Sequence, residues 1–280
     1  MHRDFEVAGP VELDVRLASG EIEIDPTLDG RVEIDLSAHD EESQRLVDNA
    51  RIDLQERQGR PEVLVDVQQR KGGFGFSFSF GRSGITCRIR CPHETGAAIR
   101  TKSADIRARG TLGALNVATA SGDIEVDRVE GGVNVKSASA DFSARDVGPV
   151  SITTASGDIE IEIVRGPAHI ATASGDVKIE AAYDSVNSNT VSGDQSHDAV
   201  MRGNVALNSV SGDVTVGVRR GSRVYLDCNT VSGDTSSELE LSTEPAGGEG
   251  PLVEIRAKTV SGDIRITRAP APADTQEVHA

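Results

Sequence analysis

The tripeptide Ser-Gly-Asp recurs through most of this chain of 280 residues at a nearly constant spacing. From Ser103 onward the steps between successive copies are 18, 18, 17, 18, 18, 19, 21 and 29 residues. A unit this short cannot bury its own apolar side chains, so it must stack on its neighbours. The full copies begin at Ser121, Ser156, Ser174, Ser192, Ser211, Ser232 and Ser261, and the variants are Ser103-Ala104-Asp105, Ser139-Ala140-Asp141 and Ser19-Gly20-Glu21.

One repeat unit shows how the chain fills a coil. Leu115, Val117 and Thr119 alternate with outward residues, Gly122-Asp123 turns a corner, and Ile124 resumes the alternation. Period-two alternation inside a repeat of about 18 residues predicts short strands stacked in parallel. We therefore predict an all-β fold, a parallel β-solenoid with about 18 residues per coil. Because crossovers between parallel strands are right-handed by default, we expect a right-handed β-helix.

Residues 1–92 depart from this regularity and are predicted to form an N-terminal β region with one short helix. The helix is expected over residues 40–51, since Asp40 can cap it and acidic residues follow in the first turn. Ser19-Gly20-Glu21 lies between alternating apolar residues, which indicates an early coil. This region is expected to be continuous with the repeats.

Residues 93–267 are predicted to form the solenoid repeats. Within them, the long spacing near the end indicates a longer arm and loop over residues 236–251. Alternating Ala and Pro from Ala269 onward predict a disordered tail over residues 268–280.

Composition and charge exclude several classes of protein. The formal net charge of −16 argues against nucleic-acid binding. No apolar stretch is long enough for a transmembrane segment or for a secretion signal, so we expect a cytoplasmic protein. Cys87, Cys91 and Cys228 fall on inward positions and are expected to be small buried side chains. Along one strand Cys87 and Cys91 would lie roughly 13 Å apart, which is too far for a disulfide.

The aspartate of each repeat is more regular than the glycine, which becomes alanine at positions 104 and 140. We expect the corner to need a small residue for which a positive φ is not obligatory, followed by a carboxylate that accepts hydrogen bonds from nearby backbone N–H groups. The alternative is that the stacked carboxylates bind cations. The members of this aspartate ladder are Asp123, Asp141, Asp158, Asp176, Asp194, Asp213, Asp234 and Asp263, beginning at Asp105.

The remaining polar residues give no catalytic site, metal centre or cofactor site. The Thr and Ser before each corner, such as Thr172 and Ser174, are predicted to form hydroxyl ladders inside the solenoid. His197-Asp198 beside Ser196 is expected to be a solvated turn, because adjacent residues rarely make a catalytic triad. A polysaccharide-cleaving β-helix would need aromatic or basic groove residues, and aromatics are only 3% of this chain.

One segment stands apart because four of the six Phe residues lie within it, at alternate positions. Alternation would place all four on one face of a strand in a hairpin at residues 72–82. Such a face is too apolar to stay exposed. It could be a lid over an open end of the solenoid, a docking surface for another subunit, or a contact with a membrane or partner. The residues are Phe74, Phe76, Phe78 and Phe80.

With these repeats, the distinct N-terminal region and the single helix, the chain resembles the bacterial β-strand-repeat proteins called "putative adhesins" or toast-rack domains. The resemblance covers roughly residues 5–267. It implies a β-solenoid fold and a family without an assigned function, and it offers no catalytic residues to carry over.

We therefore predict a non-enzymatic scaffold or interaction protein that binds a protein partner or itself. The first alternative is a cation- or glycan-binding surface module that uses the aspartate ladder. A more remote one is a β-helix enzyme that acts on polysaccharides.

Overall fold

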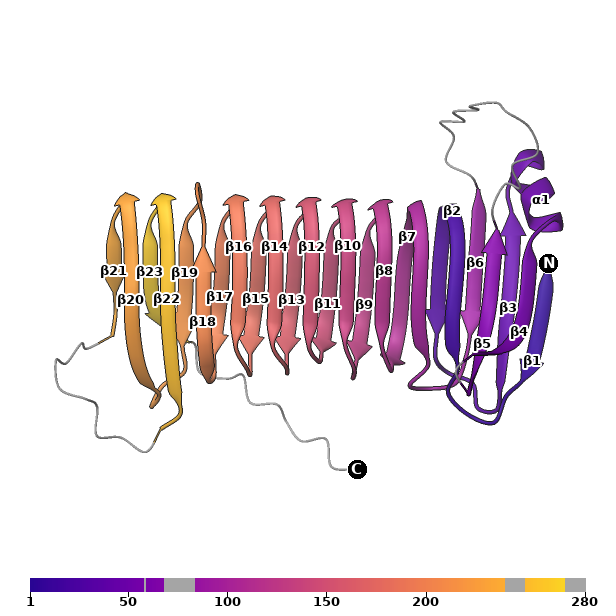
Figure 1. Cartoon of the computed structure of the whole chain (residues 1–280), viewed down its shortest axis with the longest axis horizontal. Coiled ribbons are helices and arrows are strands. Elements are labelled where there is room, and N and C mark those ends of the chain that lie inside the picture. Colours follow the sequence, from indigo (N-terminus) through magenta and orange to yellow (C-terminus); the bar gives the residue numbers. More distant parts are fainter. Residues whose placement is uncertain (58, 68–83, 240–249, 270–280) are drawn as a thin grey trace.

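The structure, a computed structural model, describes residues 1–57, 59–67, 84–239 and 250–269. It is a straight stack of β-strand coils with one short helix beside its N-terminal end (Figure 1). Neighbouring coils pair in parallel. The predicted all-β parallel solenoid is therefore confirmed. The Phe-rich segment lies outside the described residues, as does most of the predicted tail.

The central coils each contain two strands that meet at a Ser-Gly-Asp corner or, between β10 and β11, at Ser139-Ala140-Asp141. Even-numbered strands stack into one parallel sheet, called here the first sheet, and odd-numbered strands stack into the second sheet. Register is kept from coil to coil, so that Val133 lies between Leu115 and Val150. The strands are β8 (Leu115–Ser121), β9 (Ile124–Val129), β10 (Val133–Ser139), β11 (Phe142–Val147), β12 (Val150–Ser156), β13 (Ile159–Val164), β14 (Ala168–Ser174), β15 (Val177–Ala182), β16 (Val186–Ser192) and β17 (Gln195–Val200).

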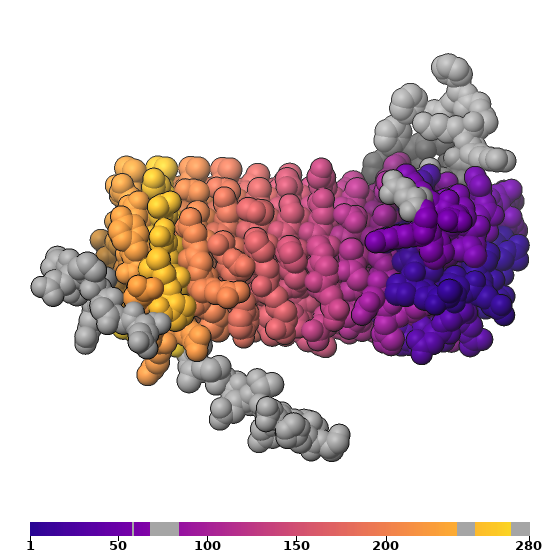
Figure 2. Space-filling model, turned by 60° about the horizontal axis from the view of Figure 1, so that its bottom comes forward, coloured from indigo at the N-terminus to yellow at the C-terminus, as the bar shows by residue number. Residues whose placement is uncertain are grey.

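At the C-terminal end the coils do not follow the order of the sequence. β18 pairs with β22, and β22 pairs with β20. The last coil of the chain is therefore inserted between the two coils that precede it, and Figure 2 shows this coil as a yellow band between orange ones. The strands are β18 (Gly203–Asn208), β19 (Val214–Val218), β20 (Arg223–Ser232), β21 (Thr235–Ser237), β22 (Leu252–Ser261) and β23 (Ile264–Arg268).

The N-terminal end is also built out of order. The predicted early coil is a single strand, β2, in which Ser19 and Gly20 lie beside Ser103 and Ala104 of β7. Beyond β2, β3 pairs antiparallel with β1 and β6, and β4 pairs antiparallel with β5. β5 and β6 pair with one side of β2, and β7 then pairs with its other side. The elements are β1 (His2–Glu6), β2 (Glu12–Asp25), β3 (Arg31–Ala38), α1 (Glu41–Asp48), β4 (Arg51–Arg57), β5 (Arg60–Val67), β6 (Ile85–Arg90) and β7 (Gly96–Leu112).

Helix α1 begins where the sequence predicts and ends earlier. Asp40 caps it through Oδ1, which accepts from the backbone N–H of Ser43 at 2.8 Å. The Ser43 hydroxyl also donates to Oδ2 of Asp40, at 2.6 Å. This bond, followed by the one from the Ser43 N–H, holds the pKa of the Asp40 carboxyl below its usual value. At the other end the Asn49 side chain donates to the carbonyl of Arg45, and Arg51 already begins β4.

The corner glycines overturn the expectation that any small residue suffices. All seven glycines of the full Ser-Gly-Asp copies have a positive φ, between 111° and 149°. A Cβ on Gly175 would lie 2.2 Å from the carbonyl oxygen of Gly157 in the coil before it. Alanine occurs only at Ala104 and Ala140, whose backbone φ is not positive. The close approach of successive coils therefore makes glycine necessary wherever the corner takes this conformation.

The hydroxyl ladders are only half as predicted. The threonines before the corners are buried, except for the half-buried Thr230, whereas the serines of the full Ser-Gly-Asp copies are not buried. Thr119 Oγ1 donates to the carbonyl of Ser121 at 2.6 Å, and Thr154 makes the same bond to Ser156 at 3.1 Å. Thr119 and Thr154 thus hydrogen-bond the corner backbone, which turns outward at the serine. Thr172 Oγ1 has no hydrogen-bond partner among the described residues.

His197 is not in a solvated turn, as the sequence suggested, but is fully buried in β17. It lies between Ile179 and Val216 in the inward column of the second sheet. Neither ring nitrogen has a hydrogen-bond partner among the described residues. Burial lowers the pKa of His197 to about 4.

The cysteines are free. Cys87 and Cys91 are buried, which raises the pKa of each thiol to about 12, chiefly by desolvation. Cys228 is half-buried and burial raises its pKa as well. All three thiols are therefore protonated near neutral pH.

We predict that Gly175→Ala lowers the free energy of unfolding by about 3 kcal/mol, because the residue would keep a strained φ and press a Cβ against a backbone carbonyl. Gly132→Ala is the matched control, since nothing lies within 4 Å of its Cβ position and its φ is not positive. Urea unfolding followed by circular dichroism compares the two. Equal midpoints for both variants would contradict the proposed role of the corner glycine.

Burial of His197 also predicts a pH dependence. Its pKa rises from about 4 in the folded chain to the ordinary 6.5 on unfolding, so the unfolded state binds more protons. The stabilisation is complete above pH 6.5 and is lost as the pH falls toward 4, by up to about 3 kcal/mol. We expect His197→Leu to abolish this part of the pH dependence when unfolding curves are compared between pH 4 and 7. Parallel pH profiles for the two proteins would disprove it.

Candidate functional site

The aspartate ladder runs along the corner edge of the solenoid. The backbone N–H of seven of the nine aspartates donates to Oδ1 of the aspartate in the adjacent coil, as Asp176 does to Asp158 at 2.8 Å. The sequence had suggested bonds within each turn, and the structure places them between coils. The seven bonds join Asp123 to Asp105, Asp158 to Asp141, Asp176 to Asp158, Asp194 to Asp176, Asp213 to Asp194, Asp263 to Asp213 and Asp234 to Asp263.

These bonds explain why a row of like charges is tolerated. Neighbouring carboxylates about 4.8 Å apart repel by roughly 1 kcal/mol in water, and a hydrogen bond to a charged acceptor offsets that repulsion. One oxygen of each bonded carboxylate is thereby occupied. No group of three or more His, Cys, Asp or Glu side chains in the described part of the chain is placed to hold a metal ion.

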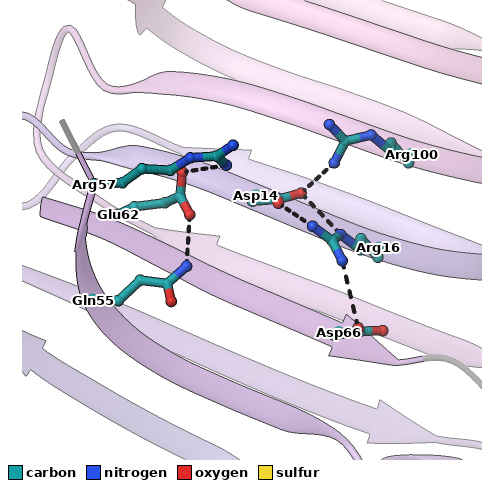
Figure 3. Close-up of polar contacts among 7 residues, drawn as sticks. All are labelled: Asp14, Arg16, Gln55, Arg57, Glu62, Asp66 and Arg100. Carbon is teal, nitrogen blue, oxygen red and sulfur yellow. Dashed lines mark hydrogen bonds and ion pairs between the residues drawn. The ribbon is translucent and has the colours of Figure 1, made fainter. Parts of the chain in front are cut away.

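A second polar feature lies on the outer face of the first sheet near the N-terminal end (Figure 3). Asp14 on β2 is only 4% exposed and accepts from Arg16 Nη2 at 2.6 Å and from Arg100 Nη1 of β7 at 2.8 Å. Arg16 also reaches Asp66 of β5 at 3.9 Å. The hydrogen bond to Asp14 raises the pKa of Arg16.

Beside this cluster, Glu62 of β5 accepts from the side chains of Gln55 at 2.7 Å and Arg57 at 3.3 Å (Figure 3). Both carboxylates, Asp14 and Glu62, are largely buried and compensated by arginine. The arrangement ties β2 to the strands on both of its sides. We therefore interpret the cluster as a structural contact that holds these strands together, in which the charges already neutralise one another, and not as a binding site for a free anion or cation.

Two open depressions lie on the same face. One of about 490 Å³ is lined by Arg100, Ala118, Thr119 and Lys136, with Thr101 and Ser137. The other, of about 600 Å³, is lined by Glu12, Leu13, Arg57, Arg60, Glu62 and Ala98. Neither lining contains a His or Cys.

The C-terminal half of the first sheet carries an exposed apolar row, which we call the valine ridge. It consists of Val191, Val210, Val260 and Val231, exposed by 54%, 49%, 49% and 81%. Each valine directly precedes a serine that is paired with the serine of the next coil, so the four side chains lie side by side. In the preceding coils the same outward position is an exposed alanine, at Ala120, Ala138, Ala155 and Ala173.

The sequence predicted the aspartate ladder and missed the valine ridge and the Asp14 cluster. Phe74, Phe76, Phe78 and Phe80 lie outside the described residues. A signal for the ridge was present, because from Ser121 onward the residue before each corner serine is Ala or Val although its parity places it outward. The Asp14 cluster had no signal, since it depends on β2 lying between β5 and β7.

A parallel solenoid of stacked coils with repeated outward rows belongs to the class of repeat proteins in which each unit contacts only its neighbours. The sequence profile of the Toastrack DUF4097 family matches residues 11–267, and the chain belongs to that family. Comparison with curated proteins gives no match.

Several solved bacterial structures are similar to this chain. A protein from Parabacteroides distasonis described as a "putative lipid binding protein" shares 15% identity, covering 96% of each chain, with a TM-score of 0.51. A "putative adhesin" from the same species shares 13% identity over 95% of this chain and 96% of that one, with a TM-score of 0.48. Another from Bacteroides fragilis shares 14% over 95% and 96%, with a TM-score of 0.44. At these identities the first likeness shows the fold alone.

The described residues contain no helix long and apolar enough to cross a membrane. Helix α1 has eight residues and packs beside β3.

We predict that Asp176→Ala lowers the free energy of unfolding by about 1 kcal/mol, because the N–H of Asp194 loses its acceptor. Asp176→Asn is the control, since its side-chain oxygen can still accept and the like-charge repulsion falls. Urea unfolding should rank the asparagine variant at or above the native protein. Equal losses for both variants would show that charge and not the hydrogen bond matters.

Proposed function

We propose that this protein is a non-enzymatic, adhesin-like interaction module that binds a protein partner along the outer face of the first sheet. The observation that carries the proposal is the valine ridge. Large apolar side chains exposed in a continuous row on an otherwise acidic chain favour a contact surface.

The surroundings of the ridge support a protein partner. Four side chains at a coil spacing of about 4.8 Å form a strip roughly 14 Å long. Two positions earlier on each strand lies a polar row that consists of Asn189, Asn208, Lys258 and Asn229. An apolar strip beside amide and ammonium groups has the composition of an interface core with its rim.

Two features outside the valine ridge favour a binding function over catalysis. The strongly shifted pKa of His197 belongs to a side chain sealed inside the solenoid, where no substrate can reach it. The exposed carboxylates of the aspartate ladder are held by backbone N–H groups. The second feature also disfavours the alternative of a cation- or glycan-binding surface on the ladder.

The test uses the triple variant Val191→Ser/Val210→Ser/Val260→Ser as bait beside the native protein, in extracts of the source cell with quantitative mass spectrometry. We expect specific proteins to bind the native chain and to be lost from the triple variant. Those hits are then confirmed with purified partner by titration calorimetry, where the affinity should fall at least tenfold.

The matched control is Glu160→Ser/Lys178→Ser/Thr215→Ser, which changes one outward row of the second sheet without altering net charge. It should bind as the native protein does. Partners that are retained by the ridge variant and lost from the control would move the interaction to the other sheet and refute the proposed surface.

A further inference from the structure

The C-terminal end of the solenoid is an unfinished coil. Within the described residues β20 pairs only with β22, and β21 pairs only with β23. The inward side chains of β20 show the consequence, because Val224, Leu226 and Cys228 are half-exposed whereas Val253 and Ile255 beneath them are fully buried. The edge therefore presents free backbone groups and an apolar row together.

The N-terminal end offers no equivalent surface. Its outer strands β1 and β4 run antiparallel to their neighbours β3 and β5, and α1 lies beside β3. Four of the five residues of β1 are exposed, and they include His2, Arg3 and Asp4. Charged edge residues of this kind oppose further strand pairing. A second copy can therefore not extend the stack head to tail as another parallel coil.

We propose that the C-terminal end binds the same end of a second copy, so that two solenoids join tail to tail with β20 antiparallel to β20 of the second copy. A two-fold axis perpendicular to both sheets makes this contact. The inference concerns the end of the solenoid and goes beyond the lateral binding proposed above, on which it does not depend.

The sequence of β20 selects one register. Antiparallel pairing must oppose inward with inward residues, which requires the axis to pass through a residue. With the axis at Cys228, Tyr225 lies opposite Val231 of the second copy and Asp227 lies opposite Asn229. Tyr225 and Val231, which are 56% and 81% exposed, then cover each other twice in the dimer.

The neighbouring registers are worse on the same criteria. With the axis at Asp227, two carboxylates face each other and Val231 meets Arg223. With the axis at Asn229, Val231 meets the carboxylate of Asp227. Like charges and apolar–charged pairs directly across antiparallel strands are unfavourable. The register at Cys228 is the one in which this edge is complementary to itself.

Light scattering after size exclusion tests the proposal on the full chain across a wide concentration range. We expect the native protein to have twice the chain mass, and Tyr225→Glu and Val231→Lys each to give a monomer with unchanged circular dichroism. The double variant should return to a dimer, because Glu at 225 then opposes Lys at 231 of the second copy. Val191→Lys, an equally outward change away from the end, should stay dimeric.

Cys228 supplies an independent test of the register. Mild oxidation with copper phenanthroline and oxygen should join two copies through Cys228, because the other two thiols are buried. Cys228→Ser should remove the cross-link and keep the dimer mass. A native protein that is monomeric throughout, or a dimer that survives Tyr225→Glu, overturns the proposal. Neither result would bear on partner binding at Val191, Val210 and Val260.

Discussion

The contact between each corner glycine and the carbonyl of the coil before it sets the geometry of the whole solenoid. A Cβ on Gly193 would lie 2.2 Å from the carbonyl oxygen of Gly175, so the coils approach as closely as backbone atoms permit. At the same corner the N–H of Asp194 is held by the carboxylate of Asp176. These two contacts fix where the coils with a full Ser-Gly-Asp copy turn, and the in-register columns of the two sheets follow from them.

The repeat itself was readable because its signals are local. Alternation, a fixed spacing and the small corner residue predict parallel strands, and the buried column of Ile161, Ile179 and Val216 follows that pattern. His197 was misjudged because its type suggested a solvated residue although its position was inward. In a long stack of equivalent coils, the position of a residue in the strand decides whether it is buried. One polar side chain is then kept inside by the apolar side chains that pack on both of its sides.

The order of the coils could not be predicted, for a physical reason. Every coil offers nearly the same pairing edge, so the repeat specifies that coils stack but not which one lies beside which. The lengthened steps before Ser232 and Ser261 were the only local trace of the rearrangement. The Asp14 cluster was unpredictable for the same reason, since its partners come from strands that the sequence order does not place together.

The two ends of the solenoid also differ in surface chemistry. Arginine–carboxylate pairs gather beside the antiparallel end, whereas valines replace alanines on the outer face toward the open end.

The inserted coil has a consequence for how the chain reaches its final form during synthesis. Strands β20 and β21 are made before β22 and β23 yet lie outside them. While the chain is growing, the coil of β20 can rest directly on β18, in the place that β22 later takes. Where that early pairing forms, β22 can enter only after it opens, so its incorporation is an exchange of neighbours and not a simple addition.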